Sequence, residues 1–203
     1  NGVTPYSCKM LYDSGVDFIT LGNHSFKRPE IMDYLDSETA IIRPYNFPEG
    51  VPGKGVGIID KGRFRVAVIN LMGTVYSEPL DNPFVEIENA LKETDECKTV
   101  IVDFHAEATA EKRAMGFYLD GRVTAVLGTH THVQTADAQL LPKGTAYITD
   151  VGMTGPINSV LGIEPELAIR KQKLHIPVRF ANADGPYYMN ACIMDIDEKT
   201  GKA

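Results

Sequence analysis

The sequence has 203 residues, of which 43% are hydrophobic and 23% charged, and its formal net charge at pH 7 is -7. This composition is that of a globular protein with one sizeable core, and we expect residues 1–203 to form a single domain. An acidic balance argues against a nucleic-acid polymer as partner, because such binding normally rests on a basic surface. An anionic small substrate would therefore need locally bound cations.

No apolar stretch reaches the roughly 18 residues that a membrane span needs, and the first residues lack the pattern of a signal peptide. We therefore expect a cytoplasmic protein without a membrane partner. The three cysteines, Cys8, Cys97 and Cys192, are far apart and form no CxxC pair, which argues against a disulfide framework or a thiolate zinc site. The number of subunits is left open, and a homo-oligomer is compatible with the sequence.

Helix and strand signals alternate along the first two thirds of the chain. Thr4-Pro5 has the pattern of an N-cap followed by the first helical residue, and Gly15 is typical of a helix stop. Short β-branched runs that alternate with helices are typical of parallel strands buried on both faces, so we predict an α/β fold. The predicted order is helix 4–15, strand 16–21, helix 29–35, strand 41–42, hairpin strands 56–59 and 64–71, helix 84–93, strand 99–102, helix 108–119 and strand 123–127.

The last third is predicted to be richer in strands, at residues 146–149, 176–181 and 187–196, with a helix over 164–173. Both ends of the domain are expected to be incomplete. A hairpin turn at 197–201 has only two residues after it, and the chain opens on a helix that feeds its first strand, as though a βαβ unit were missing.

Four of the five histidines lie just beyond apolar strand runs, within residues 22–24, 103–105 and 128–132. In open α/β sheets, ligands bind in the crevice beyond the carboxyl ends of the strands, because loops converge there over a rigid base. Neutral imidazoles bind divalent metals well, and an asparagine carbonyl is a neutral oxygen ligand. We therefore predict that one crevice receives the metal ligands Asn23, His105, His130 and His132.

His24 follows the predicted asparagine ligand directly, so we expect it to reach the substrate instead of the metal. It would donate a proton to a leaving oxygen or place positive charge on a pentacoordinate phosphoryl group. The alternative is a loop histidine that caps a helix end. Asp103 and Asp150 are each either an acceptor that orients a ligand or a cap of the next segment. The charged residues after His105 are expected on a solvated helix face: Glu107, Glu111, Lys112 and Arg113.

These strings resemble the later motifs of the calcineurin-like metallophosphoesterases, and the longer ones are similar to the bacterial YmdB-type branch. The resemblance implies a two-sheet α/β sandwich with a binuclear metal site, here without its first βαβ segment. The strings that carry it are Leu21-Gly22-Asn23-His24, residues 103–109 with Glu111-Lys112, residues 128–137, and Asp150-Val151-Gly152-Met153 with Gly155-Pro156.

The resemblance also implies residue roles and an activity. Asn23, His105 and His130 match ligands of one metal, His132 matches a ligand of the other, and His24 matches the acid or transition-state histidine. The substrate would be a small phosphoester, in particular a 2′,3′- or 3′,5′-cyclic nucleotide. Hydrolysis would proceed by in-line attack of a metal-activated hydroxide on phosphorus.

One departure from the family pattern concerns carboxylates. The family opens with a Gly-Asp strand end and a Gly-Glu-Asn segment, which supply one metal's aspartate and the bridging carboxylate, and this sequence contains neither. Two cations about 4 Å apart repel strongly without a bridging anion. We therefore expect two divalent or mixed-valence ions, iron or manganese, in the complete protein, and one ion or none in these 203 residues.

Two alternatives follow from the same residues. One is a catalytically impaired, metal-poor scaffold or regulatory module with the same fold, which the absent carboxylates favour. The other is a mononuclear zinc hydrolase of the amidohydrolase kind, which also uses a His-x-His pair but carries it on the first strand of a barrel.

Overall fold

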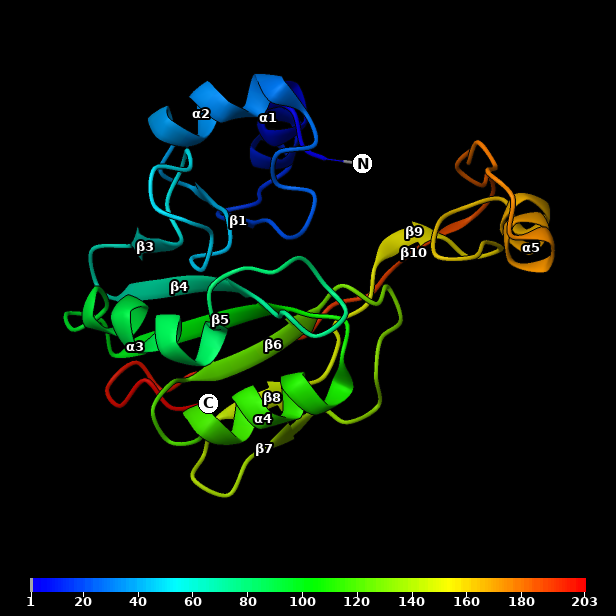
Figure 1. The fold of residues 1–203 in the computed structure, drawn as a ribbon. Coiled ribbons are helices and arrows are strands. Elements are labelled where there is room, and N and C mark those ends of the chain that lie inside the picture. The colour runs from blue at the N-terminus through cyan, green and yellow to red at the C-terminus, as the bar shows by residue number, and fades with distance from the viewer. Residues whose placement is uncertain (1) are drawn as a thin grey trace.

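The computed structural model describes residues 2–203, which form an α/β body and a projecting arm (Figure 1). The body is built on a six-stranded sheet with the order β3-β4-β5-β6-β8-β7. Its four central strands run parallel, whereas the edge strands β3 and β7 run antiparallel to their neighbours. The strands are β3 (Val56–Asp60), β4 (Arg65–Met72), β5 (Thr99–His105), β6 (Ala125–Thr129), β7 (Gln139–Leu140) and β8 (Ala146–Ile148).

Two helices, α3 (Pro83–Lys92) and α4 (Thr109–Leu119), cover one face of this sheet (Figure 1). Both confirm predicted helices. Their inward residues, such as Ile87 and Met115, are fully buried together with Phe104 of β5 in the main hydrophobic core. None of the helices in residues 2–203 is both long enough and apolar enough to cross a bilayer.

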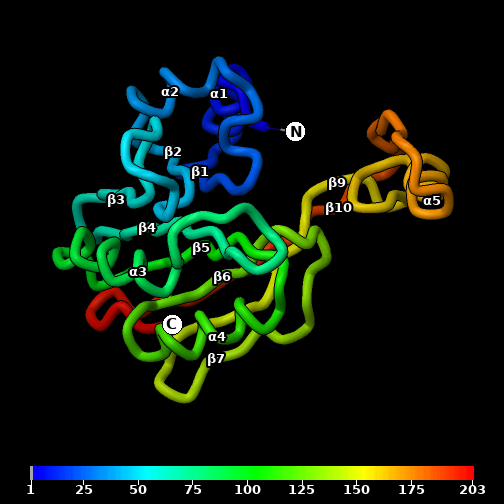
Figure 2. Tube along the Cα trace, viewed as in Figure 1, coloured from blue at the N-terminus to red at the C-terminus, as the bar shows by residue number. Residues whose placement is uncertain are grey.

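The amino-terminal segment forms a second, smaller layer, drawn in blue in Figure 2. It contains a two-stranded parallel sheet and its own core around Cys8, Ile31 and Leu35, and Asn70 of β4 donates a hydrogen bond of 2.6 Å to the carbonyl oxygen of Leu21. The predicted two-sheet α/β arrangement is confirmed. Its elements are α1 (Pro5–Asp13), β1 (Ile19–Thr20), a short 3₁₀ helix (Pro29–Ile31), α2 (Met32–Ser37) and β2 (Ile41–Ile42).

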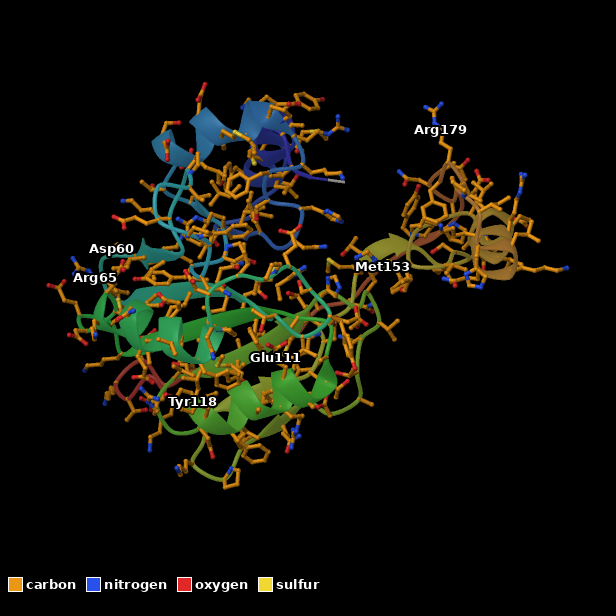
Figure 3. The ribbon with its side chains drawn as sticks, viewed as in Figure 1. Asp60, Arg65, Glu111, Tyr118, Met153 and Arg179 are labelled. Carbon is orange, nitrogen blue, oxygen red and sulfur yellow. The ribbon has the colours of Figure 1, made fainter. Side chains whose placement is uncertain are left out.

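The β3–β4 hairpin confirms its prediction and is closed by an ion pair between Asp60 and Arg65, with the Arg65 Nε 2.9 Å from the Asp60 Oδ2. Both side chains are labelled at the edge of the sheet that lies away from the arm (Figure 3). Gly62 has a φ of 72° in the turn, a conformation that glycine adopts without a steric penalty.

The arm consists of β9 (Thr154–Pro156), α5 (Pro165–Leu174) and β10 (Tyr187–Met189), with β9 and β10 paired antiparallel (Figure 1). The helix confirms its prediction. The predicted strand over 176–181 is wrong, because the segment after α5 has no strand partner and includes Pro177, which lacks an N–H. The predicted strand over 187–196 is shortened to β10, since β9 offers only three residues to pair with.

Parallel register sets the positions of the residues at the carboxyl edge. Met72 of β4 lies opposite His105 of β5, and His105 lies opposite Thr129 of β6. Asp103 and His105 are two residues apart on one strand, so they project from the same face of the sheet. The register therefore brings Asp103, His105 and Thr129 together before any loop contributes.

Gly128 is required for the close packing of β6 against the segment after β8. A Cβ at this position would overlap the backbone carbonyl of Thr149, which cannot move without breaking the sheet. We expect Gly128→Ala to lower the free energy of unfolding by at least about 2 kcal/mol, measured by denaturant unfolding. The control is Gly155→Ala, where the nearest atoms to a new Cβ lie at 3.4 Å on the Met153 side chain. Equal losses in the two variants would contradict this account.

Candidate active site

Three loops meet at the carboxyl edge of the sheet. The turn after β1 carries Asn23 and His24, β5 ends at His105, and the loop after β6 carries His130 and His132. Gly22 permits the close approach of the first loop, because a Cβ there would overlap the imidazole ring of His105. A larger residue at position 22 would therefore push the turn away from His105.

Three of the four predicted ligands form a compact cluster. The Nε2 of His105 lies 3.0 Å from the Oδ1 of Asn23 and 3.1 Å from the Nδ1 of His130. The two imidazole rings are nearly perpendicular, with an interplanar angle of 74° and centroids 4.8 Å apart. The structure thus brings Asn23, His105 and His130 together from three separate segments.

A buried chain of hydrogen bonds sets the tautomer of His105, and burial sets its charge. The hydroxyl of Thr129 donates to the Oδ1 of Asp103 at 2.8 Å, so at 3.0 Å it accepts from the Nδ1 of His105. Burial, followed by the positive charges of His130 and Lys112, lowers the pKa of His105 to about 3. The ring is therefore neutral, and its Nε2 presents a lone pair to Asn23 and His130.

Asp103 acts on His105 through Thr129 rather than by direct contact. Its side chain is buried, and burial raises its pKa to about 6, although hydrogen bonds from Thr20 and Thr129 oppose this shift. Of the two interpretations that the sequence allowed, the structure favours the orienting acceptor.

His130 is held from its other side by Glu107. The Nε2 of His130 lies 3.0 Å from the Oε2 of Glu107, and its Nδ1 is directed at His105. The sequence predicted Glu107 on a solvated face but did not predict its contact with His130. The signal for that contact is the position of Glu107 two residues beyond His105, a predicted ligand.

The prediction of a solvated face is wrong for two residues of α4, whereas Glu107 is exposed as predicted. Glu111 and Lys112 are 8% and 1% exposed. Glu111 lies under the loop after β4 (Figure 3) and accepts hydrogen bonds from the backbone N–H of Thr74 at 2.9 Å and of Val75 at 3.3 Å. A helical charge pattern alone cannot show that loops fold over that face.

His132 stands apart from the cluster. Its side chain is exposed, and its Nδ1 lies 3.2 Å from the carbonyl oxygen of Leu161 in the arm. If that nitrogen carries the proton, Nε2 is left as the free lone pair. The structure therefore does not join His132 to Asn23, His105 and His130 by direct contact.

His24 lines a cavity of about 440 Å³ together with Thr20, His105 and Thr129. The pKa of His24 is lowered, first by burial and then by positive charge that includes Lys27, His130 and His132. The shared cavity lies beside the cluster, and contact of His24 with the substrate stays a prediction.

The cluster has the chemistry of a cation site. An imidazole lone pair and an amide oxygen 3.0 Å apart are two acceptors that gain from a cation between them. The 3.0 Å separation of these two atoms is short enough for one bound ion to contact both. Within residues 2–203, no three His, Cys, Asp or Glu side chains gather closely enough to hold a metal, so the fit rests on two imidazoles and an amide. These residues suit one ion.

The fold and the cluster together define a metallophosphoesterase-type enzyme. The family model described as YmdB-like protein matches residues 1–203. The chain belongs to this YmdB-like family. It is 48% identical over 203 residues to the 2′,3′-cyclic-nucleotide 2′-phosphodiesterase of Bacillus subtilis strain 168, and the match covers 100% of this chain and 77% of that protein.

Solved structures agree with this assignment. A crystal structure of a hypothetical protein from Thermus thermophilus aligns with a TM-score of 0.88 at 43% identity, covering 92% of this chain and 73% of that one. A structure described as a novel phosphatase from Mycoplasma pneumoniae aligns with a TM-score of 0.83 at 36% identity, covering 90% and 67%. Both likenesses extend over most of this chain.

Replacing Thr129 tests the hydrogen-bond chain behind His105. In Thr129→Val, Asp103 loses a donor and the Nδ1 of His105 loses its acceptor, so we expect a loss of about 1–3 kcal/mol in the free energy of unfolding. We also expect ¹⁵N imidazole spectra to show the Nδ1–H tautomer of His105 in the parent and a mixture of tautomers in the variant. Thr154→Val, at an exposed position of β9, is the control. An unchanged tautomer in Thr129→Val would refute the chain.

Proposed function

We propose that this protein is a metal-dependent phosphodiesterase that hydrolyses small phosphodiesters, with 2′,3′-cyclic nucleotides as the first substrate class and 3′,5′-cyclic nucleotides as the second. The observation that carries the proposal is the convergence of Asn23, His105 and His130, with His24 on the same cavity. The Bacillus subtilis relative, named as a 2′,3′-cyclic-nucleotide 2′-phosphodiesterase, supports the substrate class.

The proposed cofactors are two metal ions, iron or manganese. Asn23, His105 and His130 would hold one ion, and His132 would contribute to the other. When bound, such ions supply Lewis-acid stabilisation of phosphoryl oxygens and activation of water. Imidazole and amide donors suit iron and manganese better than they suit calcium, which prefers an all-oxygen shell.

The chain's own residues have distinct tasks in this proposal. Burial keeps His105 neutral, and Thr129 and Asp103 orient its ring, so no proton competes for its Nε2. His24 donates a hydrogen bond or a proton to the leaving oxygen, since even a neutral imidazole keeps one N–H. The cavity beside these rings gives the phosphate access to both.

The cluster itself favours one alternative: a metal-poor scaffold or regulatory module with the same fold. No carboxylate of residues 2–203 joins Asn23, His105 and His130, and a pair of neighbouring cations needs an anion between them. The amidohydrolase alternative is wrong, because the sheet is open and the His-x-His pair follows β6 instead of the first strand of a barrel.

Metal content and hydrolysis of 2′,3′-cyclic AMP distinguish the enzyme from the scaffold. We would compare this chain with a form extended at its amino end by the family's two carboxylate-bearing segments. We expect two ions per chain and turnover in the extended form, and one ion or none in the 203-residue chain. An extended form that binds two ions yet hydrolyses no phosphodiester would make the scaffold the correct assignment.

Replacing His24 tests its role directly. In the extended form, His24→Ala should keep its metal content, because His24 is not among the proposed ligands, while kcat falls by roughly 100-fold or more. His175→Ala is the matched control, since His175 is exposed at the end of α5. A variant of His24 that loses metal together with activity would show that His24 is a ligand instead.

A further inference from the structure

A buried ion pair lies behind the His130–Thr131–His132 loop. The Nζ of Lys112 in α4 lies 2.8 Å from the Oδ2 of Asp150, and the two side chains are only 1% and 0% exposed. Lone charges at such depth are strongly unfavourable, so each side chain depends on the other. The pair links the middle of α4 to the segment that follows β8.

The carboxylate of Asp150 also holds backbone. The same Oδ2 accepts the N–H of Thr131 at 2.9 Å, and Oδ1 accepts the N–H of Gly152 at 2.9 Å. Burial by itself would raise the pKa of Asp150, and the hydrogen bonds from Lys112, Thr131 and Gly152 hold it below its ordinary value. Asp150 is therefore a buried carboxylate that binds Lys112, the segment after β8 and the loop between His130 and His132.

That loop is strained at both histidines. His130 has a φ of 111° and His132 a φ of 66°, in the region that residues other than glycine rarely adopt. Each such conformation costs on the order of 1–3 kcal/mol and persists only where surrounding contacts impose it. The hydrogen bond from Thr131, which lies between the two, is the contact that Asp150 supplies.

We propose that the buried Lys112–Asp150 pair is a positioning device for His130 and His132: Lys112 fixes the Asp150 carboxylate, and that carboxylate holds the Thr131 N–H so that the strained loop directs both imidazoles. This inference rests on the proposed function, in which both histidines serve the metal site. Lys112 and Asp150 are positioning residues that touch neither substrate nor metal. The role of the Asp150-Val151-Gly152-Met153 segment is then to hold the loop that carries His130 and His132.

A purely structural pair would stabilise the fold without affecting the loop, and a matched control separates the two roles. Asp120 is also a buried carboxylate, 5% exposed, and it accepts the N–H of Lys143 at 2.9 Å and of Thr145 at 3.4 Å. It lies at the end of α4 and its contacts involve a different loop. Asp120→Asn therefore repeats the chemical change of Asp150→Asn away from the histidines.

The experiment uses the amino-extended form described above and measures thermal stability, Mn²⁺ affinity by calorimetry and hydrogen exchange of the Thr131 amide by NMR. We expect both Asn variants to lose stability, and only Asp150→Asn to lose roughly 10- to 100-fold in Mn²⁺ affinity, the usual range for outer contacts of metal ligands. Its Thr131 amide should exchange at least about tenfold faster. Wild-type affinity and protection in a folded Asp150→Asn would overturn the proposal.

If Asp150→Asn does not fold, the pair of changes Lys112→Met and Asp150→Asn keeps the test decisive, because it removes both charges and leaves neither unpaired. We expect this double variant to regain stability without regaining Thr131 protection or Mn²⁺ affinity. Asp150 accepts the Thr131 and Gly152 N–H groups on two different oxygens, whereas asparagine has one acceptor oxygen and Lys112 is no longer present to fix its orientation. If the double variant regains stability, Thr131 protection and Mn²⁺ affinity together, the Lys112–Asp150 pair has only a structural role. An amino-extended parent that binds no Mn²⁺ would count against the proposed function, while Thr131 exchange would still decide the positioning role.

Discussion

The parallel register of β5 against β6 is the constraint on which the site depends. It sets Thr129 beside His105 and on the same face as Asp103, so a hydroxyl can bridge a buried carboxylate and an imidazole. A shift of one residue would turn Thr129 to the opposite face. The orientation of the His105 ring follows from this arrangement, and the contacts with Asn23 and His130 are built on it.

The histidines differ in how the protein supports them. His105 ends a strand and is fixed by the sheet, whereas His130 and His132 lie on a loop with left-handed backbone and need contacts from elsewhere. Those contacts come from Glu107 for His130 and from the carbonyl of Leu161 for His132. Rigid placement therefore comes from the sheet for His105 and from side-chain and arm contacts for His130 and His132.

Much of this could be predicted from the sequence, because strand-end histidines are a local signal. β-branched runs located β5 and β6, and the edge where they end was enough to group Asn23, His105 and His130. The isolation of His132 could not be predicted, since a spacing of two residues does not reveal positive φ angles. The burial of Lys112 depends on Asp150, 38 residues away, and helical periodicity contains no information about such a partner.

Two consecutive charged residues of helix α4, Glu111 and Lys112, act on two different loops. Glu111 accepts a hydrogen bond from the backbone of the loop after β4. Lys112 binds the Asp150 carboxylate, which accepts a hydrogen bond from the backbone of the loop after β6. Neighbouring residues on a helix point about 100° apart, so one rigid helix contacts both loop-holding partners at once. Any repacking beneath Met115 that tilts α4 would disturb both loops together, so tolerance to change in this part of the core is limited by the placement of these loops as well as by folding.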